Sequence, residues 1–293
     1  MDAVLAETPR SGVLSIETAR GDGEVAYLDF GRNARPVDAV FLHANGFNAG
    51  TYRSILEPLA RRFRILAPDL RGHGASRLPI APEGRNSWID LRDDLIAFLD
   101  GLRLGPVVLS GHSMGGTLGL LAAAGAPERV KALALFDPVI LSEPSAGLAK
   151  LREGPLVQGA ARRRRLFGSR AAAVEAYRGR GAFVTWPEAM LGDYVDAGFR
   201  DRADGGVEIA CAPEWEVSNY LAQTHDPWAA FDQSHCPIHI WRAEQNSTCA
   251  LDPRLERLSA GGRVRVDTVR GTTHFLPMER PDVVRAGLSA VIG

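Results

Sequence analysis

Short apolar runs that alternate with helical patterns constrain the fold of this chain more than any other feature. Strands of five to seven apolar residues separated by helices indicate βαβ units, whose parallel strands form a sheet covered by helices on both faces. We expect strands at residues 37–43, 64–67, 106–110, 130–136, 237–241 and 263–269, after an opening hairpin of residues 13–18 and 24–30. Helices are expected at residues 50–62, 87–102, 114–124, 252–259 and 281–291. The chain is therefore predicted to be an α/β protein with a mostly parallel central sheet.

This alternation stops after Asp137-Pro138 and resumes only late in the chain. The stretch between is rich in arginine and aromatic residues and has no clear strands. An insertion of this size in an α/β domain is typical of a small helical lid. We therefore predict one domain whose first part is residues 1–139 and whose second part is residues 232–293, interrupted by a helical lid at residues 140–231.

The overall charge and the cysteines exclude several classes of protein. Lys+Arg 34 against Asp+Glu 35 give a net charge of -1, so no overall field attracts nucleic acid or anionic lipid. The three cysteines form no paired motif, which favours a reducing compartment. We see no basic and apolar leader, and no run of the roughly 18 apolar residues that a membrane span needs. We expect a soluble cytoplasmic protein with no nucleic-acid partner and no membrane span, and a homodimer is compatible with the sequence.

A G-x-S-x-G motif, Gly111-His-Ser-Met-Gly115, lies between a predicted strand and a predicted helix. In such a tight turn the flanking positions have to be small, and the hydroxyl of Ser113 is raised above the sheet edge at a helix N-terminus. A serine hydroxyl needs a base to take its proton. His274 lies between the last predicted strand and the last helix, in a Gly- and Thr-rich turn that can aim an imidazole over the sheet. We predict Ser113 as the nucleophile and His274 as the base.

These motifs resemble those of the α/β-hydrolase family, in its lidded branch of carboxylesterases, lactonases, lipases and C–C bond hydrolases. The resemblance rests on residues 37–47, 67–76, 111–116 and 271–281, and with the strand order it covers the chain outside the insertion. It implies an α/β-hydrolase fold without a cofactor, in which nucleophile, acid and base follow one another along the chain. It does not indicate the substrate.

The predicted acid departs from the commonest pattern of that family. Most relatives carry an aspartate after the strand that follows the lid, where this chain has Asn246. An amide holds an imidazole but does not stabilise an imidazolium, and this exchange cost a trypsin-like triad about 10⁴ in turnover. Some relatives carry the acid one strand earlier, just before the lid, where this chain has Asp137. We predict Asp137 as the acid and keep Glu244 as the alternative, although a turn cap before Pro138 is a common structural role for aspartate.

Acyl transfer also needs an oxyanion hole of two N–H donors. The resemblance assigns one donor to the backbone N–H of Met114, which follows the nucleophile, and the other to the loop after the strand at residues 37–43. Relatives have a His-Gly pair in that loop, whereas this chain has two extra residues between His43 and Gly46. An alignment on Gly46 makes Phe47 the donor, and an alignment on His43 makes it Asn45. We predict Phe47.

Other residue patterns give weaker signals. The seven histidines are scattered and form no metal-binding motif, and no phosphate-binding glycine loop is present, so neither a metal nor a nucleotide cofactor is expected. The run Arg162–Arg165 is read as a solvated lid helix, because the whole chain has no basic excess. Residues 141–181 contain nine basic and three acidic side chains, a local charge of +6 that favours an anionic substrate.

The sequence as a whole predicts a serine hydrolase that acts on a small carboxylic ester through an acyl-enzyme intermediate. Lactonase, C–C bond hydrolase and cofactor-free perhydrolase or haloperoxidase activities remain open, because the same triad serves them. A non-catalytic binding protein of the same fold is the alternative from another class. Asn246 favours that alternative, whereas Ser113 and His274 oppose it.

Overall fold

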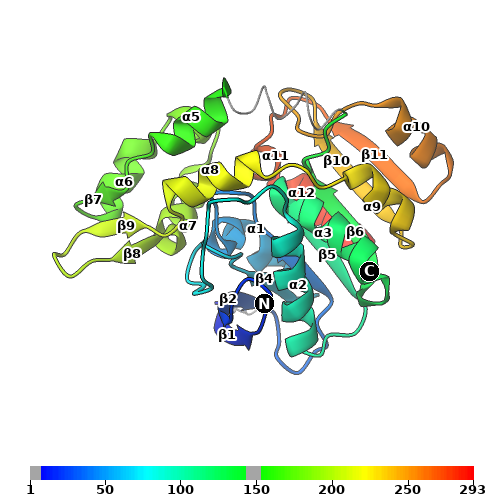
Figure 1. Cartoon of the computed structure of the whole chain (residues 1–293), viewed down its shortest axis with the longest axis horizontal. Coiled ribbons are helices and arrows are strands. Elements are labelled where there is room, and N and C mark those ends of the chain that lie inside the picture. The colour runs from blue at the N-terminus through cyan, green and yellow to red at the C-terminus, as the bar shows by residue number, and fades with distance from the viewer. Residues whose placement is uncertain (1–7, 143–152) are drawn as a thin grey trace, which may run out of the picture.

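The computed structural model describes residues 8–142 and 153–293 of the chain. Glu143, Lys150 and Arg152, which carry three of the charges counted in the insertion, lie outside these ranges. An eight-stranded sheet has the order β1-β2-β4-β3-β5-β6-β10-β11 (Figure 1). β2 pairs antiparallel with β1 and β4, and the other neighbours are parallel, which confirms the predicted mostly parallel sheet. The strands are β1 (Arg10–Ile16), β2 (Gly23–Phe30), β3 (Ala39–Leu42), β4 (Ile65–Pro68), β5 (Val107–His112), β6 (Val130–Phe136), β10 (Ile238–Ala243) and β11 (Val264–Val269).

Different helices cover the two faces of this sheet. Successive side chains of a strand point to opposite faces, so Phe41 of β3 packs into one core and Leu42 into the other. The core around Phe41 includes side chains of the helices α1 (Arg53–Leu56), α11 (Leu276–Glu279) and α12 (Pro281–Ile292). The core around Leu42 includes side chains of α2 (Ile89–Gly101), α3 (Met114–Gly125), α9 (Pro227–Gln233) and α10 (Pro253–Ala260). The sheet is therefore buried on both sides, as its continuous apolar strands require.

The helix predicted at residues 50–62 is instead three short helical segments. These are η1 (Ala49–Tyr52), α1 and η2 (Glu57–Leu59). Pro58 has no N–H to donate and its ring opposes a helix that continues through it, so the α-helical segment ends before it. Each end of the other predicted helices of the sheet domain lies within two residues of the observed end.

The insertion contains short strands that the sequence did not reveal. Its helices gather at one side of the molecule together with a three-stranded antiparallel sheet of order β7-β9-β8 (Figure 1). The prediction that the insertion has no strands is therefore wrong. Strands of two or three residues are too short to produce a recognisable alternation of polar and apolar side chains. The elements are α5 (Pro155–Ala161), β7 (Leu166–Phe167), α6 (Arg170–Tyr177), η4 (Gly181–Phe183), α7 (Glu188–Gly198), β8 (Phe199–Asp201), β9 (Val207–Ile209) and α8 (Pro213–Leu221).

Candidate active site

Ser113 lies at the turn between β5 and α3 with a strained backbone. Its φ of 55° and ψ of -122° are outside the regions that L-residues prefer, which costs about 1–3 kcal/mol. A Cβ on Gly115 would come within 2.3 Å of the carbonyl oxygen of Leu42, and a Cβ on Gly111 within 2.5 Å of the carbonyl carbon of Gly115. Both glycines are therefore needed for α3 to approach the sheet closely enough to form this turn.

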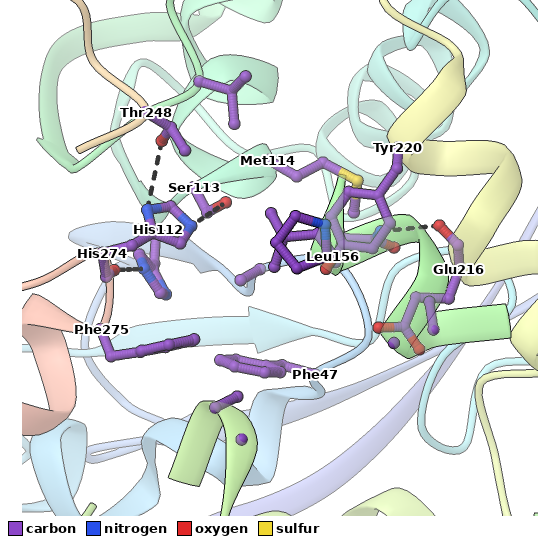
Figure 2. Close-up of a pocket in the computed structure, with 18 of the residues that line it drawn as sticks. Phe47, His112, Ser113, Met114, Leu156, Glu216, Tyr220, Thr248, His274 and Phe275 are labelled. Atoms are coloured by element: carbon purple, nitrogen blue, oxygen red, sulfur yellow. Dashed lines mark hydrogen bonds between the residues drawn. The ribbon is translucent and has the colours of Figure 1, made fainter. Parts of the chain in front are cut away.

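The structure joins three of the predicted residues in one hydrogen-bonded chain. Nε2 of His274 lies 2.9 Å from Oγ of Ser113 (Figure 2). Nδ1 of the same ring lies 2.6 Å from Oδ2 of Asp137. Because a carboxylate only accepts hydrogen bonds, the proton of the neutral imidazole is on Nδ1, and Nε2 is free to accept from the serine hydroxyl. This tautomer is the one that a general base needs.

The fully buried carboxylate of Asp137 is surrounded by donors from the loop after β10. Oδ1 accepts the N–H of Ala243 at 2.7 Å and the hydroxyl of Ser247 at 2.5 Å, and Oδ2 accepts the N–H of Thr248 at 3.1 Å. Burial alone would raise the pKa of Asp137, but the hydrogen bonds from His274, Ser247 and Ala243 outweigh it, and the pKa is below its ordinary value. The carboxylate is therefore ionised at neutral pH.

The two other residues considered for the acid lie elsewhere. Asn246 is exposed, with a left-handed φ of 51°. Glu244 is also exposed, and its carboxylate accepts the N–H of Gly271 at 2.9 Å. Within the described ranges, neither side chain hydrogen-bonds to His274. The loop that carries the acid in most relatives here supplies hydrogen-bond donors to Asp137 instead.

His112 connects the base to the loop after β3. Its Nε2 lies 2.7 Å from the carbonyl oxygen of His274 and must donate to it (Figure 2), so Nδ1 accepts from the hydroxyl of Tyr52 at 2.8 Å. The same hydroxyl accepts the N–H of Ala44 at 3.2 Å. Burial lowers the pKa of His112 to about 3, so the imidazole stays neutral. The chain of contacts fixes the backbone of the base relative to the loop opposite Ser113.

The loop of residues 43–47 leaves one backbone donor unused. The N–H of Phe47 donates to the carbonyl of Ala44 at 3.1 Å, in a turn in which Gly46 has a φ of 74°. The N–H of Gly46 donates to Nε2 of His73 at 3.1 Å. In the part of the chain that the structure describes, the N–H of Asn45 has no partner, and neither has the N–H of Met114 at the start of α3.

The side chain of Asn45 is held by the helix α8. Its Nδ2 donates to the carbonyl of Glu216 at 2.9 Å, and its Oδ1 accepts from Nδ2 of Asn219 at 2.9 Å. Oδ1 of Asn219 in turn accepts from the guanidinium of Arg85 at 2.5 Å, which forms a bidentate pair with Asp90. These side chains are buried, so the loop is held from a segment about 170 residues away in the sequence.

A cavity of about 550 Å³ opens beside Ser113 and His274. Figure 2 shows these two residues at one side of the cavity and Tyr220 and Glu216 of α8 at the other. Apolar side chains, among them Met114, form much of the wall between. Of the aromatic residues of the insertion, Phe183 and Tyr220 line the cavity, together with Tyr177, whereas most of the others pack against each other. Further described lining residues are Phe47, Trp88, Val139, Leu141, Leu156, Ala160, Arg163, Arg164, Arg180, Gln223, Thr248 and Phe275.

Comparison with known proteins places the chain in a family. The model of the alpha/beta hydrolase family matches residues 39–286. The chain belongs to this family. One relative of this alpha/beta hydrolase, 2-(acetamidomethylene)succinate hydrolase of Mesorhizobium japonicum, is 25% identical over 260 residues, which cover 86% of this chain and 87% of that protein. A solved structure of E-2-(acetamidomethylene)succinate hydrolase has a TM-score of 0.76 at 23% identity, covers 97% of this chain and 99% of that one, and shows the same fold.

A further relative matches only part of this alpha/beta hydrolase. The dihydrolipoyllysine-residue acetyltransferase component of the acetoin cleaving system of Pseudomonas putida is 35% identical over 120 residues, or 41% of this chain. The match spans 30% of that protein's length. Over the described residues, no helix has the length and apolar character needed to cross a bilayer, and no group of three His, Cys, Asp or Glu side chains is arranged to hold a metal.

Some site residues of this alpha/beta hydrolase carried no recognisable signal in the sequence. Ser247 and Thr248 directly follow Asn246, the position where most relatives have the acid. This nearness in the sequence is the one hint that Ser247 and Thr248 contact the site. His112 lies inside the G-x-S-x-G motif, but nothing in the motif indicates its bond to the backbone of His274. Asn219 lies in the insertion, about 170 residues from the loop it contacts.

Proposed function

We propose that this alpha/beta hydrolase is a serine hydrolase of carboxylic esters. The observation that carries the proposal is the hydrogen-bonded chain from Ser113 through His274 to the buried Asp137. A strained serine at the start of a helix, a base with the correct tautomer and an ionised acid behind it are the parts that acyl transfer needs. The family and its hydrolase relatives support hydrolysis as the class of reaction.

The proposed reaction has two halves. Oγ of Ser113 attacks the ester carbonyl while Nε2 of His274 takes the hydroxyl proton, and the imidazolium then gives this proton to the departing alcohol. Asp137 stabilises the imidazolium and holds its orientation. A water molecule, deprotonated by His274, attacks the acyl-enzyme and releases the carboxylic acid. The net reaction is ester plus water to acid plus alcohol, with no cofactor.

For the oxyanion hole we propose the N–H groups of Met114 and Asn45. Phe47, the second donor predicted from the sequence, already donates its N–H to the carbonyl of Ala44. A donor that is bonded within its own turn contributes less to a developing oxyanion than one with no partner. Asn45 also lines the cavity, and its side chain is held at both ends by α8.

We further propose that residues 140–231 act as the lid of this site. The described part of the insertion supplies cavity residues from α5, η4 and α8, so it closes the side of the cavity that faces away from the sheet. The last helix of this range, α9, begins within it but contacts α3 of the sheet domain. Within this range, we therefore propose that the elements from α5 to α8 cover the cavity.

The test of the proposed function is labelling with a fluorophosphonate, followed by intact mass and peptide mapping. A single stoichiometric adduct on Ser113 that is lost in Ser113→Ala and slowed in His274→Ala supports the proposal. A panel of simple esters, lactones and vinylogous diketones then identifies the bond that is cleaved. If folded protein takes no adduct and hydrolyses none of the panel, the proposal fails and the binding-protein alternative gains support.

A further inference from the structure

A partly buried arginine faces the cavity from the lid with most of its donors unused. Arg163, just after α5, lines the cavity with a side chain that is 14% exposed. Its guanidinium lies 2.8 Å from a carboxylate oxygen of Glu216, whose side chain is 4% exposed. Within the described ranges it makes no side-chain hydrogen bond. A guanidinium has five N–H donors, and only one side of this one faces Glu216. Its remaining donors are therefore available to an acceptor in the cavity that Arg163 lines.

Two more arginines line the same part of the cavity. Arg180 is exposed, and no described carboxylate pairs with it. Arg164 donates Nε to the carbonyl of Leu166 at 2.8 Å and stacks on Phe167, which leaves its terminal nitrogens for other partners. The described lining residues thus carry three arginines against one acid, Glu216, a balance of 3 − 1 = +2.

Several other lid arginines pair with carboxylates of the lid. Arg170 pairs with Asp201, Arg178 with Glu175 and Glu188, and Arg202 with Asp204. The count of +6 over residues 141–181 is thus reduced by acids that lie outside that stretch, such as Asp201 and Glu188. Among the described residues, Arg164 and Arg180 of the cavity wall have no paired carboxylate. Part of the charge that the sequence suggested for a substrate therefore lies at the cavity wall.

We propose that the substrate is an ester with a carboxylate remote from the scissile bond, and that Arg163, assisted by Arg164 and Arg180, binds this carboxylate. The proposal rests on the proposed ester hydrolysis and adds the class of substrate. The planar guanidinium matches a carboxylate through two parallel N–H···O bonds. Glu216 braces Arg163 from behind and fixes its orientation, while the apolar wall formed by Met114, Leu156 and Phe183 contacts the chain between the two ends of the substrate.

The first measurement compares esters that differ only in the remote group. One series consists of p-nitrophenyl monoesters of straight-chain dicarboxylic acids against p-nitrophenyl alkanoates of matched length, and a second places the carboxylate on the alcohol. We expect kcat/KM of the carboxylate member to exceed that of its neutral partner about tenfold to a hundredfold in at least one series, as hydrogen bonds to charged groups provide. The preference should shrink at high salt. Equal rates in both series overturn the inference.

The second measurement uses variants of the cavity wall. The double substitution Arg163→Met with Glu216→Leu replaces the whole ion pair, which proteins usually tolerate better than the loss of one partner. We expect the carboxylate preference to fall to about one, mainly through KM. If this variant fails to fold, Arg180→Gln provides the test, with a smaller loss of preference. Arg202→Gln is the matched control, since this lid arginine pairs with Asp204 outside the cavity, and its preference should equal that of the parent protein.

The outcomes separate this inference from the proposed function. A protein that hydrolyses neutral esters as fast as carboxylate esters, or a double variant that keeps the preference, overturns the inference alone. A protein that hydrolyses no ester and takes no fluorophosphonate adduct overturns the proposed function.

Discussion

Replacement of Asp137 by asparagine tests the proposed triad most directly, because every group around the carboxylate is a donor. Oδ1 accepts from Ala243 and Ser247, and Oδ2 accepts from Thr248 and His274. An amide has one oxygen and one NH2 group, so the two donors that now bond to one of the carboxylate oxygens would face an NH2 group instead. The effect on His274 depends on which oxygen is replaced.

The amide oxygen is expected to stay at the Oδ1 position. In the opposite orientation the NH2 group would face the buried N–H of Ala243 at 2.7 Å, which costs about 1–3 kcal/mol. With the oxygen at Oδ1, the NH2 group faces Nδ1 of His274, and the imidazole responds by moving its proton to Nε2. That tautomer no longer accepts from Ser113. We expect kcat to fall about 10⁴-fold, as in other serine triads, which corresponds to about 5.4 kcal/mol in the barrier.

The assay is the initial rate on a p-nitrophenyl ester, normalised by the amount of folded protein. Glu244→Gln is the matched control, because Glu244 is exposed and contacts only the N–H of Gly271 in the described residues. Its rate should stay within about twofold of the parent, as for most surface substitutions. An Asp137→Asn variant that keeps more than about a tenth of kcat would refute the reasoning. So would a Glu244→Gln variant that loses as much activity as Asp137→Asn.

Three further predictions concern the loops and the fold. Asn219→Leu removes the hydrogen bond to Oδ1 of Asn45 and so one support of the loop of residues 43–47. We expect the acylation rate to fall about tenfold with little change in KM, which is less than the loss of an oxyanion donor itself would cause. An unchanged rate would argue against this support. Gly115→Ala brings a Cβ within 2.3 Å of a carbonyl oxygen, so the free energy of unfolding should fall by about 1–3 kcal/mol. Gly192→Ala is the control, because a Cβ there meets nothing within 4 Å and should not lower the free energy of unfolding. Burial lowers the pKa of His43 to about 4 and that of His112 to about 3, so between pH 6.5 and 4 each binds a proton only after unfolding. These two histidines should therefore lower the free energy of unfolding on acidification through that window, by up to about 1.4 kcal/mol per pH unit each. Asp69, whose pKa burial raises to about 6, opposes this below pH 6 but is one group against two. A melting temperature that stays flat or rises across the window contradicts the prediction.

The sheet and the nucleophile turn were predictable because local rules specify them. Buried parallel strands read as short continuous apolar runs, and the Gly-x-Ser-x-Gly spacing has a steric cause that the structure makes visible at Gly115. Of the described part of the insertion, only the helical content was predictable. Its strands of two or three residues lie below the length at which a pattern emerges, and Pro58 in the sheet domain broke a helix whose apolar pattern continues past it.

The sequence predicts the acid only through the resemblance. Asn246 occupies the usual position, Asp137 lies where some relatives carry the acid, and Glu244 remains the alternative. The structure adds a physical reason for this exchange that no local pattern contains. The loop around Asn246 donates hydrogen bonds to the carboxylate of Asp137 through Ser247 and Thr248, and these bonds favour its ionised form.

The second oxyanion donor shows where sequence reasoning ends. Counting from Gly46 favours Phe47 and counting from His43 favours Asn45, and no residue in the loop decides between them. Our proposal of Asn45 depends on which N–H has no partner, and this is a property of the whole fold. The turn uses the N–H of Phe47, and His73 from the loop after β4 accepts that of Gly46. A free donor is defined by contacts that are missing, so it becomes visible only when every neighbour of the loop has been placed.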